Sequence, residues 1–377
     1  MRYARQPFSV VVISFMSILH YQQRYNSEGP MANTYVELAV DGYEKVMQCQ
    51  NDSVGFTAWI AVHNTARGPA LGGCRVWRYS SDEAGLSDVL RLGRGMTYKN
   101  ALAQLPLGGG KSVINADIRT IDRAALFEAM GEFVDQCCGE YIIAEDVNST
   151  VDDMAIVMTR TSHVATVGGS GNPSPFTAYG VLCGIKASVF HKWGIEDISG
   201  LRIAIQGAGE TGGRLARMLH DEGCQLIVAD INQANLKNLA ATTPFETVDP
   251  DQILAVKCDV FAPCALGGIL NEKSIPHLRC GIVAGSANNQ LQSEVDGRLL
   301  HQRNILYAPD YAINAGGVIN ISCEIGQPYC SNRAKTRTEK IAATLREIYQ
   351  LSADTDIPTS QVADMLALDF LSTRLAA

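Results

Sequence analysis

A glycine-rich turn between a short apolar strand and a helix constrains this chain more than any other feature. Residues 201–206 form the strand, and the turn that follows reads Gly207-Ala208-Gly209-Glu210-Thr211-Gly212. Gly207 permits a tight turn, Gly209 lets the backbone approach a pyrophosphate, and Gly212 allows the helix to pack closely on the strand. The helix N-terminus adds positive potential and free N–H groups. The segment predicts a dinucleotide site in a Rossmann-type unit.

The strand after this helix ends on Asp230, about 20 residues beyond the first glycine, where the ribose-binding acid of such units lies. An acid at this point disfavours the 2′-phosphate of NADP, so NAD is the predicted cofactor. Glu210 is unusual, because a carboxylate beside a pyrophosphate should repel it, although it suits the helix dipole if it points away. A purely structural βαβ unit is the alternative interpretation.

Strand and helix patterns alternate after residue 175, which is typical of a doubly wound parallel sheet. The predicted strands are 202–206, 226–230, 259–262, 281–284 and 305–307, and a helix at 176–193 precedes them. In the first half, strands are predicted at 56–62 and 112–116, and helices at 83–95 and 123–137. Residues 168–175 are rich in Gly, Ser and Pro and form a candidate hinge.

The predicted fold class is therefore α/β with two domains and a cleft between them. An N-terminal α/β substrate domain occupies residues 31–170, and a Rossmann-type doubly wound parallel-sheet domain occupies 171–320. Helices make up residues 321–377, and residues 1–30 form an N-terminal extension.

The extension contains the most apolar stretch of the chain, Phe8 to Leu19. This stretch is shorter than the roughly 20 residues that span a bilayer, and no small-residue cleavage site follows it. We expect Met31 to be the natural start and the extension to be upstream reading frame. A genuine extra element and a targeting segment are the alternatives.

Composition excludes several classes of protein. The formal net charge of −8 disfavours nucleic acid as a partner, since sequence-independent binding to DNA needs basic excess. The eleven cysteines include no CxxC pair and no metal-ligand spacing, so we expect reduced thiols, no metal site and a cytoplasmic location. No membrane association is expected.

Two lysines in the first half are candidates for chemistry. Lys99 ends the segment 95–99, and Lys111 directly follows three glycines, which let the backbone approach a small ligand closely. One lysine could hold a substrate carboxylate, while the other, with its pKa lowered by burial and by its neighbour, could act as a base. Asp146 could exchange protons with an amine. Surface lysines on solvated turns are the alternative.

With these residues in view, the sequence resembles the leucine/phenylalanine/valine dehydrogenase branch of the amino-acid dehydrogenase superfamily, relatives of glutamate dehydrogenase. The segments that carry the resemblance are 68–75, 95–100, 107–111, 144–147, 207–212, 262–268, 287–290 and 309–317. They span most of the chain.

The resemblance implies reversible oxidative deamination, in which an L-amino acid and NAD yield a 2-oxo acid, ammonium and NADH. It implies that Lys99 and Asn288 bind the substrate carboxylate, that Lys111 is the general acid/base acting on water, and that Asp146 handles protons at the amino group. By resemblance, Thr177 contacts the nicotinamide amide and Arg75 lies near the cofactor phosphates. Further cofactor contacts by resemblance are Cys264, Ala265, Ala287 and Asn289. A homo-oligomer, dimer or octamer, is also implied.

The substrate side chain is expected to be apolar, because the matching pocket segments contain no extra basic residue for a second carboxylate. The positions that resemble the pocket are Leu71, Gly72, Ala144, Ile313 and Val318. Leu71 and the Ala-Glu-Asp order favour leucine or valine. Asn148 and the run from Ala262 to Asn271 also resemble tryptophan-using members, so phenylalanine or tryptophan is the alternative.

Two other classes compete. A nonredox NAD-binding regulator on the same fold would not need both lysines and Asp146. A dehydrogenase of 2-hydroxy acids normally uses a catalytic histidine with an acid partner. We expect His63 and His163 to be structural, and Cys264 to be either a packed thiol or a cofactor contact.

Overall fold

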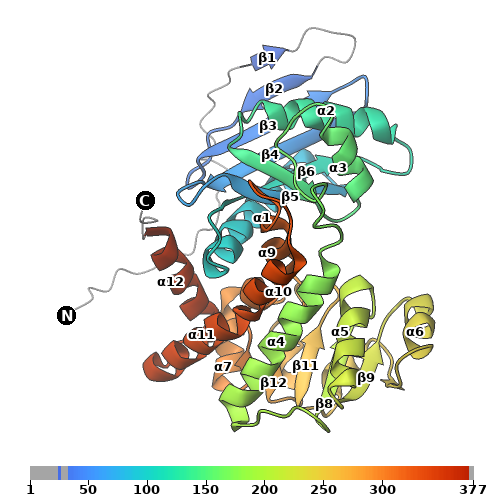
Figure 1. Cartoon of the computed structure of the whole chain (residues 1–377), viewed down its shortest axis with the longest axis vertical. Helices are drawn as coiled ribbons and strands as arrows, with labels where there is room; N and C mark the ends of the chain where they lie inside the picture. The colour runs from blue at the N-terminus through green and yellow to red at the C-terminus, as the bar shows by residue number, and fades with distance from the viewer. Residues whose placement is uncertain (1–23, 27–32, 373–377) are drawn as a thin grey trace, which may run out of the picture.

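The computed structural model describes residues 24–26 and 33–372, which form two α/β units stacked along the long axis of the molecule (Figure 1). One sheet has seven strands and the other has six. The predicted two-domain α/β class is confirmed. Most of the predicted extension, residues 1–30, lies outside the described residues. Within the described residues, no helix is long and apolar enough to cross a membrane.

The first sheet has the strand order β1-β2-β3-β4-β6-β5-β7. Its strands are β1 (Arg24–Asn26), β2 (Thr34–Glu37), β3 (Lys45–Asn51), β4 (Phe56–Asn64), β5 (Ala70–Trp77), β6 (Gly108–Asn115) and β7 (Tyr141–Glu145). Pairing is antiparallel from β1 to β4 and between β4 and β6, whereas β5 runs parallel to β6 and β7. The three parallel strands therefore point their carboxyl ends the same way.

Three helices cover this sheet. Helix α1 (Asp82–Leu102) packs Val89 and Leu90 against Trp59 on one face. Helices α2 (Arg123–Asp135) and α3 (Val151–Val157) cover the other face. The predicted helix at 83–95 was too short at its end, because α1 continues to Leu102 and carries Lys99 on its last turn. Lys99 therefore projects from a helix and not from a solvated turn.

The second sheet is wholly parallel, in the order β10-β9-β8-β11-β12-β13. Its strands are β8 (Arg202–Gln206), β9 (Gln225–Ala229), β10 (Glu246–Thr247), β11 (Val260–Pro263), β12 (Ile282–Val283) and β13 (Leu306–Tyr307). Strands β9 and β10 extend to one side of β8, and β11 to β13 extend to the other. The strand order therefore reverses direction at β8. In doubly wound sheets, ligands bind in the crevice beyond the carboxyl ends of the strands at such a point.

Helices surround the second sheet. They are α4 (Ser174–Trp193), α5 (Glu210–Asp221), α6 (Gln233–Ala240) and α7 (Glu294–Gln302), with short 3₁₀ turns at Ile253–Ala255 and Ile275–His277. The rest are α8 (Asp310–Ile313), α9 (Gly316–Ser322), α10 (Ser331–Glu339), α11 (Ile341–Thr355) and α12 (Thr359–Ser372). The predicted boundary between the Rossmann-type domain and the C-terminal helices, at residue 320, falls inside α9. The division into domains at residues 170 and 320 stays a prediction.

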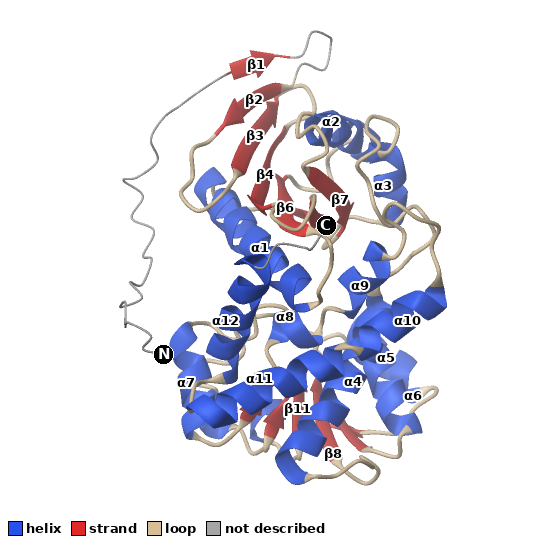
Figure 2. Cartoon of the chain, turned by 60° about the vertical axis from the view of Figure 1, so that its left-hand side comes forward, coloured by secondary structure: helices blue, strands red, loops and turns tan. Residues whose placement is uncertain are grey.

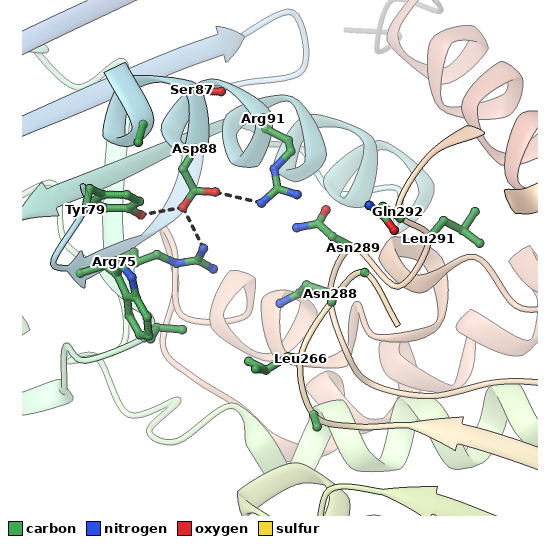
Figure 3. A pocket seen from close by; sticks show the side chains of 16 residues that line it. Arg75, Tyr79, Ser87, Asp88, Arg91, Leu266, Asn288, Asn289, Leu291 and Gln292 are labelled. Carbon is green, nitrogen blue, oxygen red and sulfur yellow. Dashed lines mark hydrogen bonds and ion pairs between the residues drawn. The ribbon is translucent and has the colours of Figure 1, made fainter. Parts of the chain in front are cut away.

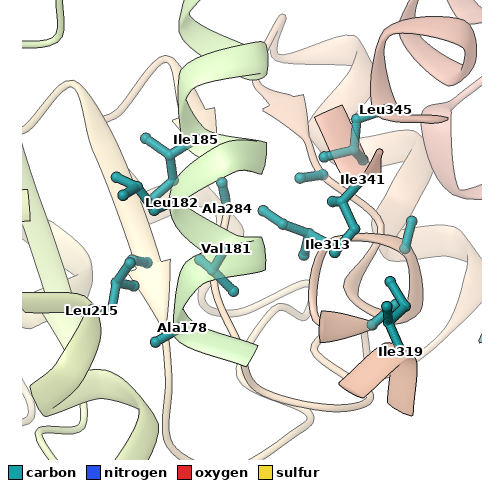
Figure 4. Close-up of a cluster of buried hydrophobic side chains, with 14 of the residues drawn as sticks. Ala178, Val181, Leu182, Ile185, Leu215, Ala284, Ile313, Ile319, Ile341 and Leu345 are labelled. Carbon is teal, nitrogen blue, oxygen red and sulfur yellow. The ribbon is translucent and has the colours of Figure 1, made fainter. Parts of the chain in front are cut away.

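One apolar core runs through both units. Around α4, Val181 and Ile185 pack with Leu215 on one side and Ile313 on the other (Figure 4). The same cluster continues into the first unit through Leu71 and through the end of α1. The two units are thus joined by buried apolar contacts as well as by the chain.

The chain crosses between the units in residues 158–173. Thr166 has φ of +78°, a left-handed conformation that strains a β-branched residue. Glu324 holds this crossing in place, because its carboxylate accepts hydrogen bonds from the N–H groups of Thr166 and Ser170.

The C-terminal helix returns to the first unit. Helix α12 lies beside α1 (Figure 2), and Arg67 Nη1 donates a hydrogen bond to the carbonyl oxygen of Phe370 at 2.7 Å. Thr344 Oγ1 on α11 donates to the carbonyl oxygen of Leu102 at 3.4 Å. The two units are therefore attached at the crossing and again at α11 and α12.

The three glycines before Lys111 were predicted to let the backbone approach a ligand, but in the structure they pack against other parts of the protein. They lie inside β6, and each is close to neighbouring backbone and not to open space. A Cβ at Gly108 would lie 2.1 Å from the carbonyl oxygen of Asn64, and one at Gly109 would lie 2.0 Å from the nitrogen of Thr97. Gly109 lets α1 and β6 approach each other, whereas Gly108 and Gly110 make room for the neighbouring strands and loops.

Candidate active site

Lys111 and Asp146 form a largely buried ion pair toward the β7 edge of the first sheet. Lys111 lies on β6 with 5% of its side chain exposed, and Asp146 directly follows β7. The Lys111 Nζ atom lies 2.9 Å from Asp146 Oδ2. Strand β5 separates β6 from β7, so the two side chains meet across an intervening strand.

Gly73 on β5 makes this meeting possible, and the sequence analysis did not identify it. A Cβ at Gly73 would lie 2.7 Å from the Cβ of Asp146 and 3.2 Å from Lys111 Nζ. Any side chain there would push the ion pair apart. The signal was present as the second glycine of Leu71-Gly72-Gly73, but only the three-dimensional register shows what it faces.

Arg75 is a second cation beside Asp146. Its Nε donates to Asp146 Oδ2 at 3.3 Å, and its Nη1 donates to Asp88 Oδ2 at 2.9 Å. Burial acts to raise the pKa of Asp146, but the charges of Lys111 and Arg75 outweigh it, so the pKa lies below its usual range. Asp146 is therefore a stable carboxylate. Arg75, predicted to lie near the cofactor phosphates, is already engaged by two carboxylates.

Lys99 reaches toward the same centre from the end of α1. Burial lowers the pKa of its amine to about 8, and the charge of Lys111 adds to this effect. The carboxylates of Asp310 and Asp146 oppose it. Lys99 Nζ donates to Asn288 Oδ1 at 3.2 Å, a hydrogen bond that joins the first unit to the second.

Asn314 fixes the orientation of Asn288. The Nδ2 atom of Asn314 donates to Asn288 Oδ1 at 2.8 Å and to the carbonyl oxygen of Ser286 at 3.1 Å. Because Asn288 Oδ1 accepts from both Asn314 and Lys99, its amide nitrogen is left free to face the cleft (Figure 3). Asn314 lies in a segment that carries the family resemblance, yet no role was assigned to it from the sequence.

The glycine-rich turn has the geometry that a pyrophosphate requires. Gly207 has φ of +96°, and a Cβ at Gly212 would lie 2.0 Å from the carbonyl oxygen of Gly207, so both glycines are required by the backbone. A Cβ at Gly209 would meet nothing within 4 Å, which leaves the start of α5 open to a ligand. Thr211 lies in the first turn of α5.

Asp230 and Glu210 have distinct environments. Asp230 Oδ2 accepts hydrogen bonds from the N–H of Ala208 at 2.7 Å and from Asn235 Nδ2 at 3.1 Å, so it lies against the turn. Its role as a ribose acceptor stays a prediction. Glu210 pairs with Arg214 at 3.0 Å one turn along α5 and is 70% exposed. The ion pair partly neutralises Glu210, which accounts for a carboxylate at this position.

A cleft of about 750 Å³ separates the two units (Figure 3). Its wall on the first unit includes Arg75, Asp88 and Arg91, and its wall on the second includes Asn288 and Asn289. Three of the predicted cofactor contacts line this cleft, namely Arg75, Ala265 and Asn289.

The remaining predicted cofactor contacts lie in loops and turns of the second unit. Ala287 is buried, and Thr177 is in the first turn of α4, where its hydroxyl donates to the carbonyl oxygen of Pro173 at 3.2 Å. Cys264 follows β11, and burial raises the pKa of its thiol. A nucleophilic role for this thiol is therefore disfavoured.

The predicted side-chain pocket gathers apolar residues from both units. Leu71, Ala144, Ile313 and Val318 belong to one buried cluster. Gly72 is explained by packing instead, because a Cβ there would lie 1.9 Å from the carbonyl oxygen of Gly110. The pocket thus has an apolar wall and no charge of its own among these positions.

The two histidines singled out in the sequence have structural contacts. His63 Nδ1 lies 2.9 Å from Thr97 Oγ1, and its ring packs edge-on against Tyr43. Burial lowers the pKa of His63 to about 4, so its ring is neutral at physiological pH. The ring of His163 lies against Gly139. In the described part of the chain, no group of three or more His, Cys, Asp or Glu side chains could hold a metal ion.

Comparison with known families agrees with this geometry. The family described as Glu/Leu/Phe/Val dehydrogenase, dimerisation domain, matches residues 43–163, and the one described as Glutamate/Leucine/Phenylalanine/Valine dehydrogenase matches residues 225–365. A leucine dehydrogenase of Geobacillus stearothermophilus is 46% identical over 335 residues, which cover 88% of this chain and 91% of that protein. An L-tryptophan dehydrogenase of Nostoc punctiforme is 42% identical and covers 87% and 93% respectively.

Solved structures show the same fold. The crystal structure of L-tryptophan dehydrogenase from Nostoc punctiforme has a TM-score of 0.75 at 40% identity, and the match covers 88% of this chain and 96% of that one. The hetero-hexameric glutamate dehydrogenase of Thermus thermophilus has a TM-score of 0.72 at 22% identity, over 87% of this chain and 86% of its own. At that identity the likeness concerns the fold alone.

A doubly wound parallel sheet joined to a second α/β unit that carries a lysine–aspartate pair is the arrangement of a class, the two-domain amino-acid dehydrogenases. Both halves of the chain match one family by sequence, and the fold agrees. The chain belongs to the glutamate/leucine/phenylalanine/valine dehydrogenase family.

Proposed function

We propose that the chain catalyses the NAD-dependent, reversible oxidative deamination of an apolar L-amino acid, leucine or valine first, to its 2-oxo acid and ammonium. The observation that carries the proposal is the 2.9 Å Lys111–Asp146 pair, whose charges act on the nearby Lys99. A paired amine and carboxylate can move protons, while a separate cation holds an anionic substrate.

Substrate binding uses groups from both units. Lys99 binds the substrate carboxylate, and the free amide nitrogen of Asn288 donates a second hydrogen bond to it. Because Lys99 and Asn288 already contact each other across the cleft, the substrate carboxylate would join the same network. A charge-assisted hydrogen bond of this kind is stronger than a neutral one.

Proton transfer uses the buried pair. Asp146, held ionised by Lys111 and Arg75, accepts a proton from the substrate amino group. Lys111 takes a proton from the water that attacks the iminium carbon of the oxidised substrate, and it returns that proton when ammonium leaves. NAD, when bound at residues 207–212 and Asp230, supplies the hydride acceptor. Closure of the cleft would exclude bulk water from the hydride step.

The side-chain pocket supports an apolar substrate. Leu71, Ala144 and Val318 are buried and uncharged, and they leave no partner for a second carboxylate. The leucine dehydrogenase relatives at 46% identity support leucine as the first candidate. Phenylalanine or tryptophan is the second candidate, supported by the 42% identity with an L-tryptophan dehydrogenase.

The experiment is NADH formation at alkaline pH with the purified chain. The panel is L-leucine, L-valine, L-isoleucine, L-phenylalanine, L-tryptophan and L-glutamate, each with NAD and with NADP. A signal with one apolar amino acid and NAD is expected. Activity only on 2-hydroxy acids would replace the proposal, and NAD binding without any turnover would favour a nonredox regulator on this fold.

The variant Lys99→Ala is expected to raise KM for the amino acid by about 10- to 100-fold, since a hydrogen bond to a charged group contributes about 1.5–3 kcal/mol. The KM for NAD should change little. Steady-state kinetics with each substrate varied in turn measures both constants. Lys45→Ala, a lysine of β3 that pairs with Glu140, is the matched control and should leave both constants near their original values. An unchanged amino-acid KM in Lys99→Ala would remove Lys99 from the binding site.

The variant Asp230→Ala is expected to raise the NADP-to-NAD ratio of kcat/KM by about tenfold, because it removes the charge that repels a 2′-phosphate. Affinity for NAD should also fall, since the ribose hydroxyls lose an acceptor. Asp249→Ala, an exposed carboxylate of the same unit, is the control. A natural preference for NADP in the unaltered chain would contradict the assignment of Asp230.

A homo-oligomer in the cytoplasm is the proposed context. The matched family description of residues 43–163 as a dimerisation domain supports self-association through the first unit. All eleven cysteines are free thiols, which suits a reducing compartment. Light scattering of the purified chain measures the oligomeric state.

A further inference from the structure

Two cysteines lie opposite each other at the beginning of the second sheet. Lys257 pairs with Arg279 and Val260 pairs with Ile282, both in parallel, so the same register places Cys258 opposite Cys280. Cys258 packs in the buried cluster beneath β11 and β12, and Cys280 packs against the same cluster. Both thiols therefore face one side of the sheet.

The spacing of the two strands suits a covalent link. Neighbouring strands lie about 4.8 Å apart, and disulfides join Cα atoms separated by about 4.4–6.8 Å. The backbone holds the pair at this spacing, because the N–H of Cys258 donates to the carbonyl oxygen of Arg279 at 3.3 Å and the N–H of Gly281 donates to that of Asp259 at 3.1 Å.

The two thiols differ in exposure and in charge environment. Cys258 is 8% exposed, whereas Cys280 is half-buried. The pKa of Cys280 is lowered, first because the thiol of Cys258 donates a hydrogen bond to its sulfur and further because of the guanidinium of Arg303. The same hydrogen bond raises the pKa of Cys258. A partly exposed cysteine with a lowered pKa next to a second thiol is the arrangement found in redox-sensitive cysteine pairs.

We propose that Cys258 and Cys280 form a peroxide-reactive modification site, in which hydrogen peroxide converts the two thiols into a disulfide between β11 and β12. The Cys280 thiolate attacks one peroxide oxygen, the O–O bond breaks, and Cys280 becomes a sulfenic acid while hydroxide leaves and takes up a proton. The sulfur of Cys258 then attacks the sulfur of Cys280, loses its proton and displaces water. In total, two thiols lose two electrons, and one peroxide becomes two waters.

The position of the pair separates it from the reaction centre. The two cysteines precede β11 and β12, whereas Cys264, Ala265, Ala287 and Asn289 follow the carboxyl ends of these strands. The inference therefore does not depend on the proposed reaction, and its readouts need no turnover. The expected physical effect is stabilisation, because closing the segment 258–280 restricts the unfolded chain.

The test treats the purified full chain with hydrogen peroxide, blocks remaining thiols and maps peptides without reduction. A peptide pair linking Cys258 to Cys280 is expected, reversed by dithiothreitol, with two of the eleven thiols lost in the linked species. The midpoint of thermal unfolding should rise by several degrees in the oxidised chain. Cys138→Ser, which removes an exposed thiol elsewhere, should keep the link and the shift.

Two variants distinguish the roles of the pair. Cys258→Ser should accumulate a sulfenic acid at Cys280 that a dimedone probe traps, whereas Cys280→Ser should leave Cys258 unlabelled and lose the thermal shift. Cys280 is half-buried, so its variant keeps the test valid if the buried Cys258→Ser fails to fold. Absence of the linked peptide in the folded wild-type chain, or an equal thermal shift in Cys280→Ser, would overturn the proposal.

Discussion

The variant Lys111→Ala is expected to lower kcat for amino-acid oxidation by about 10²- to 10⁴-fold, the usual contribution of a positioned general acid or base. Lys111 is buried, and its amine lies 2.9 Å from the Asp146 carboxylate, so the substitution removes the amine that is paired with this carboxylate. Binding of NAD should persist, because the glycine-rich turn and Asp230 lie in the other unit. NADH formation measures the loss of turnover, and quenching of protein fluorescence measures whether NAD still binds.

A second substitution separates charge from proton transfer. Lys111→Arg keeps a cation beside Asp146, but a guanidinium does not give up its proton in proteins. If Lys111 moves a proton, this variant should be nearly as inactive as Lys111→Ala. Recovery of turnover to within tenfold of wild type would show that only the charge is needed and would end the general acid/base assignment.

The second large effect is expected from Asp146→Asn, which keeps the shape of the side chain and removes its charge. The amide cannot accept a proton from the substrate amino group, so kcat should again fall by about 10²- to 10⁴-fold. The pKa of Asp146 lies below its usual range, because Lys111 and Arg75 outweigh the effect of burial. The wild-type carboxylate is therefore charged at neutral and alkaline pH, and the loss should appear throughout that range of the rate profile.

The neighbouring Glu145 offers a matched control for this prediction. It is half-buried and adjacent in the chain, and burial raises the pKa of its carboxyl. Glu145→Gln should leave kcat within a few-fold of wild type. An equal loss in Glu145→Gln and Asp146→Asn would indicate that any change at the end of β7 disturbs folding, and circular dichroism of both variants distinguishes that case.

Local chemistry in the sequence was sufficient for the cofactor-binding half. The glycine-rich turn, its flanking strand and helix, and Asp230 lie within one continuous segment, in which Gly207 and Gly212 are required by the backbone and Gly209 borders open space. Five of the six parallel strands of the second sheet are short apolar runs, which predicted their positions to within a few residues, whereas β10 was not predicted. The fold class followed from this regular alternation.

The first unit was harder to predict, because its site depends on contacts between distant segments. Strands β5 and β7 were not identified as strands, and the glycines of β6 were taken as an approach to a ligand, whereas each packs against neighbouring protein segments. Gly73 leaves room for Lys111 to meet Asp146, and Asn314 orients Asn288, yet neither carries a chemical signal of its own. Such roles come from register and from packing between units, and a single sequence does not contain them as a local pattern.

The return of the C-terminal helix to the first unit limits how the cleft can move. Two bodies joined by one linker can bend and twist in any direction, whereas two bodies joined at two separated points keep only rotation about the line through both points. Here one point is the crossing held by Glu324, and the other is the contact of α11 and α12 with the first unit, which includes Arg67 and Phe370. We therefore expect the cleft to open mainly by rotation about the line through these two attachments, so that each closure presents Lys99 and Asn288 to the substrate in the same alignment.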